Sequence, residues 1–281
     1  MEYKIVVDSC CDLTEKYKND PHYQVIPLTL EAGGRTFVDD ETFDQLDYLQ
    51  AVAADSEVAR TACPSPEAYM RAYEGDADMV FVVTLSRHLS GSYESAELGR
   101  TLFYEENPDS SKKIHVFSSD SAAAGESIIA FKLQELSEKG LDFEEIVEHV
   151  SSFRDNMLTY FVLDNLDTLR KNGRLTGFAA LIATTLHIKP VMRGNHGVIE
   201  KADQCRGIQK ALAKLADHIA AECDNPQEKI LSISHVNCPE RAQKVMELIC
   251  SRISGFKDIY IVNAAGVTTT YANDGGIVVS V

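Results

Sequence analysis

Basic residues are scarce in this chain of 281 residues. Lys and Arg number 27 against 43 Asp and Glu, which gives a formal net charge of −16 at pH 7. Proteins that bind nucleic acids or anionic membrane surfaces gain affinity from basic patches that release counterions from phosphates. The charge balance therefore argues against both classes of partner.

Long apolar runs and paired cysteines are missing too. No apolar run approaches the roughly 18 residues that a membrane-spanning helix needs, so we expect a soluble, cytoplasmic protein. The seven cysteines are odd in number and show no CxxC spacing, which fits neither a disulfide framework nor a zinc site. We expect reduced thiols, mostly buried, and we predict no metal and no cofactor.

Several motifs of catalysis are also absent. The chain contains no Walker loop, no GxGxxG, no HExxH and no GxSxG elbow. Ser90 with His88 or His187 could supply a nucleophile and a base, but the histidines are scattered. Two acidic runs, Asp39 to Glu41 and Glu144-Glu145, indicate solvated surfaces rather than metal ligands.

The first half of the chain repeats one pattern three times: a β-branched run, a loop rich in hydroxyl side chains, and a segment of helical period. The runs are Lys4 to Val7, Met79 to Thr84 and Ile114 to Phe117. This pattern predicts βαβ units, whose loops gather at the carboxyl edge of a parallel sheet. The helices that follow the second and third loops carry apolar residues at helical spacing, namely Leu98 and Leu102, then Ile128, Phe131 and Leu136. A further helix is expected from a cap at Asp142 to about Phe153.

The pattern changes from about Tyr160 onward. A hairpin is expected to turn at residues 194–197, between helices at 164–171, 177–185 and 207–222. Strands at 230–234, 259–262 and 277–281 and a helix at 239–253 complete the chain. The fold class is therefore α/β, with an N-terminal parallel-sheet βαβ domain at 1–155 and a C-terminal mixed α/β domain at 156–281.

Two loops could bind an anion. Ser90, Gly91 and Ser92 precede a helix, where hydroxyls and free backbone N–H groups would suit a carboxylate or phosphate, although a serine could simply cap the helix. Thr61 lies in a restricted, extended segment before Pro64 and Pro66, where it is either a ligand contact or a turn residue.

Positive charge gathers in one stretch of this acidic chain. Residues 170–210 hold eight basic residues against two acidic ones. Such a cluster can dock an acidic partner or bind an anionic group, and it can equally pair with acids elsewhere on the surface.

Taken in order, a set of short motifs resembles the DegV family, the fatty-acid-binding subunits of the bacterial fatty acid kinase, over nearly the whole chain. The matching segments are Asp8-Ser9, Gly34 to Asp39, Thr61 to Pro66, Leu89 to Ala96, Asp120-Ser121, Leu169 to Leu175, Ile188 to Pro190 and the glycines near the C-terminus. Each motif alone is weak, but their order and spacing are specific.

The resemblance implies one long-chain fatty acid held between the two domains, with its carboxylate at Thr61 and Ser90 and the Gly91 and Ser92 backbone nearby. It also implies that the chain does no chemistry itself and presents the acyl group to a separate ATP-dependent kinase for acyl phosphate formation. The candidates for the kinase-docking face are Arg170, Lys171, Arg174, Lys201 and Arg206. We expect a monomer.

Two positions depart from the pattern of the resembled family. Tyr271 stands where a His is usual, and we count it as a ligand-binding residue, while Asn172 replaces a usual Gly. A Tyr hydroxyl donates to a carboxylate but is neutral at pH 7, so the polar end of the site would be rearranged. The alternatives are an esterase-like enzyme acting on a small anionic substrate at the same crevice, and a regulatory protein that senses lipid.

Overall fold

A computed structural model of the chain describes residues 2–54, 57–175 and 188–281. Its N-terminal half contains the predicted parallel sheet, in the order β2-β1-β6-β7. The strands are β1 (Tyr3–Asp8), β2 (Tyr23–Ile26), β6 (Met79–Thr84) and β7 (Lys113–Ser118). Every residue of β6 is buried, as expected for a parallel strand that is covered on both faces.

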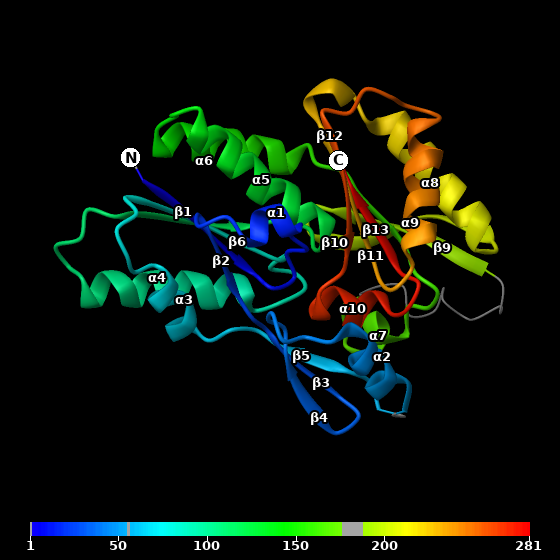
Figure 1. The fold of residues 1–281 in the computed structure, drawn as a ribbon, viewed down its shortest axis with the longest axis horizontal. Helices are drawn as coiled ribbons and strands as arrows, with labels where there is room; N and C mark the ends of the chain where they lie inside the picture. The colour runs from blue at the N-terminus through cyan, green and yellow to red at the C-terminus, as the bar shows by residue number, and fades with distance from the viewer. Residues whose placement is uncertain (1, 55–56, 176–187) are drawn as a thin grey trace.

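Two pairs of helices cover the parallel sheet (Figure 1). On one face lie α5 (Ala124–Glu138) and α6 (Phe143–Asp155), and on the other lie α3 (Pro66–Ala72) and α4 (Ser92–Glu106). The Asp142 cap is confirmed, because its side chain and that of Glu145 form a reciprocal capping box. On α5, Ile128, Phe131 and Leu136 are buried as expected.

The buried face of helix α4 is not the one that we expected from the spacing of its large apolar residues. Leu98 is 50% exposed, whereas Ala96, Gly99 and Phe103 are buried. A Cβ at Gly99 would lie 2.6 Å from the Pro66 carbonyl oxygen, so the small residue lets α3 and α4 approach closely. The apolar spacing could not reveal this contact, because small side chains rather than large ones make it.

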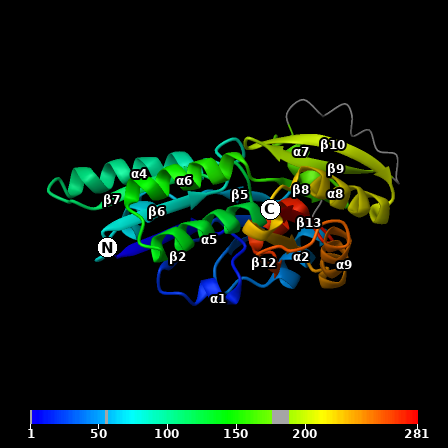
Figure 2. The same cartoon turned by 90° about the horizontal axis from the view of Figure 1, so that it is seen from above.

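The C-terminal half forms a six-stranded mixed sheet, in the order β10-β9-β8-β13-β11-β12 (Figure 2). Only β11 and β12 pair in parallel. The strands are β8 (Thr159–Val162), β9 (Ile188–Asn195), β10 (Val198–Arg206), β11 (Ile230–His235), β12 (Asp258–Asn263) and β13 (Ile277–Ser280). The accompanying helices are α7 (Asp167–Lys171), α8 (Ile208–Glu222), η1 (Pro226–Glu228) and α9 (Pro239–Cys250). Helices α8 and α9 pack on one face of this sheet.

The predicted hairpin joins β9 to β10. His196 and Gly197 at its tip have φ angles of 45° and 82°, which are the positive values that a tight hairpin turn needs. The tip docks on the N-terminal half, where the Ser86 hydroxyl donates to the Gly197 carbonyl at 2.9 Å. The expected helix at 177–185 and His187 lie outside the described residues.

A small antiparallel sheet was not predicted from the sequence. It consists of β4 (Arg35–Val38), β3 (Thr29–Ala32) and β5 (Arg60–Ala62) and carries Thr61 on β5. Two more helices of the N-terminal half are α1 (Glu15–Lys18) and α2 (Gln45–Ala54), and α10 (Gly266–Ala272) from the C-terminal half packs against α2, β3 and β5 (Figure 1).

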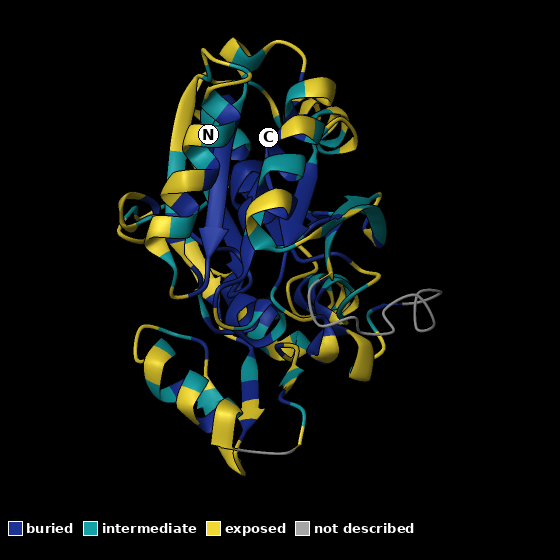
Figure 3. Ribbon diagram, turned by 90° about the vertical axis from the view of Figure 1, so that its right-hand side faces the viewer, coloured by how far each residue is buried: buried dark blue, intermediate teal, exposed yellow. Residues whose placement is uncertain are grey.

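The two halves share their interior. Helix α5 packs against β1 and β6 of one sheet and against β11 and β13 of the other. Figure 3 shows buried strands at the centre and exposed residues mainly on the outer helices and loops. The division into domains at residue 155, in the connection between α6 and β8, stays a prediction.

Two expectations drawn from composition can be compared with the fold. Within the described residues, no helix is both long and apolar enough to span a membrane. The seven cysteines are free thiols, but only Cys10, Cys11 and Cys223 are buried, so the expectation that most are buried is wrong.

Candidate functional site

An apolar cavity of about 760 Å³, including its mouth, lies between the two sheets. Loops after β1, β6 and β7 form one side of it, and the strands of the mixed sheet with α10 form the other. The apolar lining includes Leu85, Leu89, Phe161, Leu163, Leu169, Val198, Ile199, Val267 and Val278. Three loops of the parallel sheet therefore meet at one cavity, as their position after the strands predicted.

Arg174 is the one cation among the described residues that line this cavity. Its Nε donates to the Leu89 carbonyl oxygen at 3.2 Å, and its guanidinium also donates to the Asn172 carbonyl. The guanidinium carbon lies 5.7 Å from the centroid of the Tyr271 ring. The side chain is therefore held in place and can face an anionic group inside an otherwise apolar space.

Tyr271 connects the cavity to the Thr61 segment. Tyr271 lines the cavity, and its hydroxyl lies 3.0 Å from Thr61 Oγ1. The segment after Thr61 lies beside the start of α4, because a Cβ at Gly91 would be 3.4 Å from Cys63 Sγ. The structure thus brings together Thr61 and Tyr271, which are 210 residues apart in the chain.

The serine loop lies next to the cavity-lining Leu89. Ser90 Oγ is 3.1 Å from Ser92 Oγ and accepts the Ser92 backbone N–H at 3.2 Å. Gly91, which has no side chain, is the N-cap of α4, so Ser92 is the first residue of the helix. The Ser90 hydroxyl therefore caps one N–H group at the helix start, and the N–H groups of the next residues are those that can face a ligand.

The described residues place no base beside the Ser90 hydroxyl, and His187, the other candidate base, lies outside them. Among the described residues, the Ser90 hydroxyl contacts Ser92 and no histidine ring. His88 instead faces the hairpin tip, where its Cδ2 would be 2.9 Å from a Cβ at Gly197. A serine hydrolase needs a base within hydrogen-bond reach, so the geometry does not favour this chemistry.

The residues predicted to dock a partner do not lie together on one element. Arg170 and Lys171 are exposed at the end of α7, Lys201 and Arg206 lie on β10, and Arg174 lines the cavity. Arg170 itself and two further cations of the basic stretch are paired with acids. These pairs are Arg170–Asp167, Lys189–Asp164 and Arg193–Glu200. The docking face stays a prediction.

Asn172 has a structural role at its position. Its φ of −87° does not require glycine, and its side-chain amide donates to the carbonyl oxygens of Ala59 at 2.9 Å and Thr168 at 3.0 Å. These bonds connect the end of α7 to the chain just before β5. The departure from the usual Gly therefore adds a link between α7 and the segment that carries Thr61.

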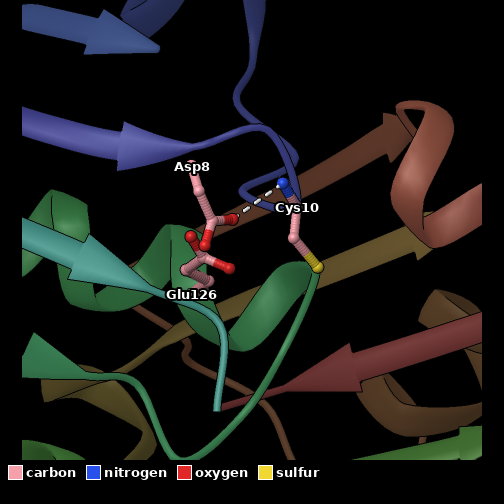
Figure 4. A group of neighbouring side chains, drawn as sticks. All are labelled: Asp8, Cys10 and Glu126. Carbon is pink, nitrogen blue, oxygen red and sulfur yellow. Dashed lines mark hydrogen bonds between the residues drawn. The ribbon is translucent and has the colours of Figure 1, made fainter. Parts of the chain in front are cut away.

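A cluster of buried acidic side chains lies next to Cys10 on the cavity lining, and the sequence analysis did not identify it. A carboxyl oxygen of Asp8, a carboxyl oxygen of Glu126 and the Sγ of Cys10 lie within 4.8 Å of one another (Figure 4). Cys10 also lines the cavity. Asp8 accepts the backbone N–H groups of Cys10 and Leu85, both at 3.0 Å, whereas both carboxyl oxygens of Glu126 lack a hydrogen-bond partner within the described residues. A signal for Glu126 was available, since it occupies the buried stripe of α5 with Ile129 and Leu133.

The protonation of this cluster follows from its burial. Burial raises the pKa of Glu126 well above its ordinary value, and the charge of Asp8 raises it further. Burial also raises the pKa of Asp8 to about 6 and that of the Cys10 thiol. At neutral pH Glu126 and the thiol therefore keep their protons, and the charge of the cluster rests on Asp8, which has two backbone donors.

Asp12 and Asp39 form a second pair of buried acids. Burial raises the pKa of Asp12 to about 7 and raises that of Asp39. Asp39 is only 3% exposed, so its assignment to a solvated surface was wrong. The sequence shows an acidic run, but it does not show that backbone N–H groups from α10 cover its first member.

The raised pKa of Asp12 predicts a pH-dependent stability. Native Asp12 binds a proton more tightly than the unfolded chain does, so its contribution to stability is fully present below its unfolded pKa near 4 and is lost as pH rises through about 7. We expect Asp12→Asn to lose this dependence, so its unfolding free energy relative to wild type should rise by a few kcal/mol between pH 4 and pH 8, at about 1.4 kcal/mol for each pKa unit.

Urea unfolding of both proteins across this pH range measures the difference. The comparison with wild type is needed because His115 and His235 have lowered pKa values and contribute an opposite slope, which cancels in the difference. Parallel curves for the two proteins would contradict the assignment.

Known proteins share the sequence pattern and the fold of this chain. A model of the DegV family of uncharacterised proteins matches residues 2–281. A DegV domain-containing protein of Streptococcus pyogenes is 34% identical over 99% of this chain and 98% of its own length. A DegV-family crystal structure from Ruminococcus gnavus, refined with vaccenic acid, is 46% identical, with a TM-score of 0.96 over 100% of this chain and 99% of that one. The Fatty Acid Kinase B3 protein of Streptococcus pneumoniae, loaded with linoleic acid, is 32% identical, with a TM-score of 0.90 over 100% of this chain and 99% of that one.

Proposed function

This chain belongs to the DegV family, and we propose that it binds one long-chain fatty acid and presents the carboxylate to a separate ATP-dependent kinase. The observation that carries the proposal is the apolar cavity with Arg174 and Tyr271 on its lining. Support comes from two relatives, 46% and 32% identical, whose structures hold vaccenic and linoleic acid.

The cavity suits an acyl tail. Each methylene transferred from water stabilises the complex by roughly 0.8 kcal/mol, so a 16-carbon chain could gain on the order of 11 kcal/mol before the cost of ordering it. The lining offers side chains of Leu, Ile, Val and Phe from both halves of the protein. We therefore expect the acid to survive purification.

The polar groups suit a carboxylate. A buried carboxylate needs hydrogen-bond donors and a counter-charge to offset its lost hydration. We place it between the Arg174 guanidinium, the Thr61–Tyr271 hydroxyl pair and the Ser90 hydroxyl with the Gly91 and Ser92 backbone. In this arrangement Arg174 binds the ligand, a role that the sequence analysis did not give it.

The chain itself supplies no catalytic step in this proposal. The Ser90 hydroxyl faces Ser92, and chemistry on the carboxylate would fall to the kinase. The exposed Arg170, Lys171 and Arg206 and the partly buried Lys201 remain our candidates for docking that partner, and a monomer remains the expected state. Another solved structure of this fold is named a fatty-acid-binding protein, and the Streptococcus pneumoniae relative carries the name Fatty Acid Kinase B3 protein.

Organic extraction followed by mass spectrometry tests the proposal. Protein purified from cells is extracted beside a buffer blank, and a second sample is extracted after incubation with hexadecanoic and octadecenoic acids. About one equivalent of a long-chain acid is expected in either sample. If neither sample releases an acid, the proposal fails and a small anionic substrate becomes the hypothesis to test.

Removing the hydroxyl donors should weaken binding. The double variant Thr61→Ala with Ser90→Ala loses two hydrogen bonds to a charged group, each worth roughly 1–2 kcal/mol, so affinity for hexadecanoic acid should fall roughly 30-fold. Titration of delipidated protein measures the change. Thr101→Ala is the control, since this exposed α4 hydroxyl donates only to the Glu97 carbonyl of its own helix. Equal affinity of the double variant and the control would contradict the site.

A further inference from the structure

Helix α10 carries Tyr271, but residues of the N-terminal half hold it in place. The Gln45 side-chain amide donates to the Ala264 carbonyl at 2.9 Å and to Thr269 Oγ1 at 3.0 Å. The Tyr48 hydroxyl lies 2.6 Å from Thr270 Oγ1. The helix, which is part of the C-terminal half in sequence, therefore contacts α2, β3 and β5 of the N-terminal half as well as α7 of its own half.

Two buried carboxylates bind three successive backbone N–H groups at the start of this helix. Asp39 Oδ1 accepts from Gly266 at 2.6 Å, and Asp39 Oδ2 accepts from Val267 at 2.9 Å. Asp12 Oδ1 accepts from Ala265 at 2.8 Å. These bonds satisfy N–H groups at the start of α10 that have no carbonyl partner within the helix.

The close approach of Asp39 depends on a glycine. A Cβ at Gly266 would lie 2.7 Å from Asp39 Oδ1 and 2.9 Å from Asp39 Cγ, so only glycine lets the carboxylate reach both N–H groups. The contact therefore needs both the Asp39 carboxylate and the absence of a side chain at Gly266.

Asp39 also belongs to the sheet that carries Thr61. It directly follows β4, and its own N–H donates to the Leu28 carbonyl at 3.0 Å. In the same sheet, β3 pairs with β5, with Leu30 opposite Thr61. The small sheet therefore contacts α10 at both ends, through Asp39 at the first turn and through Thr61 at Tyr271 in the last turn.

We propose that Asp39 is a positioning residue that sets the location of the Tyr271 hydroxyl, and with it the Thr61–Tyr271 pair, for the ligand carboxylate. The proposal rests on the proposed function for its ligand, but not for its geometry. Asp39 acts through α10 and does not touch the ligand. Asp12 supports the same helix from the loop after β1.

Asp39→Asn is the informative variant. Asparagine has nearly the same shape, but it offers one acceptor oxygen where the helix start presents two N–H groups, so α10 should lose its fixed location. Asp40→Asn is the matched control, because the side chain of the neighbouring Asp40 is only partly buried and, among the described residues, accepts from Thr42 alone.

Affinities for hexadecanoic acid and hexadecanol separate positioning from general damage. In Asp39→Asn, affinity for the acid should fall roughly tenfold, whereas affinity for the alcohol, which has no carboxylate, should stay within about twofold. The double variant Asp39→Asn with Tyr271→Phe should bind the acid no more weakly than the weaker-binding of the two single variants, because both substitutions act on the same hydroxyl. Unchanged acid affinity, equal losses for acid and alcohol, or additive losses in the double variant would each overturn the proposal.

Hydrogen exchange tests the geometry without a ligand. Amides at 264–273 should exchange faster in Asp39→Asn than in wild type or Asp40→Asn, with the rest of the protein unchanged. Unchanged exchange in this segment would overturn the positioning role. If wild-type protein binds neither probe, the proposed function fails, and the exchange result still decides whether Asp39 positions α10.

Discussion

Replacing Arg174 with glutamine is expected to lower the affinity for a long-chain fatty acid several hundred-fold. Arg174 is the one cation on the described lining of the cavity, so its loss leaves the bound carboxylate without a counter-charge. Removing one partner of a buried ion pair typically costs about 3–5 kcal/mol, which corresponds to a factor of roughly 150 to 5,000 in affinity. Titration of delipidated protein with hexadecanoic acid measures the loss.

Arg170→Gln is the matched control for this variant. Arg170 lies four residues earlier, is 41% exposed and pairs with Asp167 on the surface of α7, so its loss should leave acid affinity unchanged. Binding of hexadecanol gives a second control, because an uncharged head group should not distinguish Arg174→Gln from wild type. If Arg174→Gln binds the acid like wild type and fails instead to bind the kinase, the docking role inferred from the sequence is the correct one.

Filling the cavity should have an effect of similar size. Val278 lies on β13 and lines the cavity between Phe161 and the loops of the parallel sheet. Val278→Trp keeps a strand-forming residue and occupies space that a tail would fill. If the indole displaces about four methylenes, affinity for a 16-carbon acid should fall roughly 200-fold, at about 0.8 kcal/mol for each methylene.

Val278→Trp also introduces a fluorescent probe into the cavity, because the natural chain contains no tryptophan. Emission from the introduced indole should be blue-shifted and should change when an acid binds. Val25→Trp on the edge strand β2 is the control, because Val25 is 40% exposed and does not line the cavity. Preference in Val278→Trp should move toward shorter acids. Unchanged affinity and chain preference would show that the tail lies elsewhere.

Three of the four strands of the parallel sheet were predictable because each is signalled locally, whereas β2 was not predicted. β-branched runs, hydroxyl loops and helical spacing gave β1, β6 and β7, and the direction of parallel strands brought their loops to one edge. The hairpin at His196-Gly197 was equally local, since its two positive φ angles are favoured by the turn residues themselves.

Contacts between distant segments were not predictable in the same way. Strands β3, β4 and β5 have only three or four residues each and alternate weakly, so no period marks them. The burial of Asp39 depends on α10, more than 220 residues away in the chain. The placement of Arg174 inside the cavity depends on the packing of α7 against Leu89, and the charge pattern alone grouped it with surface cations.

The position of β13 affects how the protein can fold. Although β13 is the last strand of the chain, it lies between β8 and β11 in the middle of the six-stranded sheet. During synthesis on a ribosome, β8 and β11 emerge with no central strand to join them, and their inner edges stay open until residues 277–280 leave the exit tunnel. The N-terminal sheet can form early from its own segments, whereas the cavity wall forms only after translation of β13. The nascent chain therefore exposes the inner edges of β8 and β11 from the time each strand emerges until β13 joins them, and these edges can pair with other chains during that time.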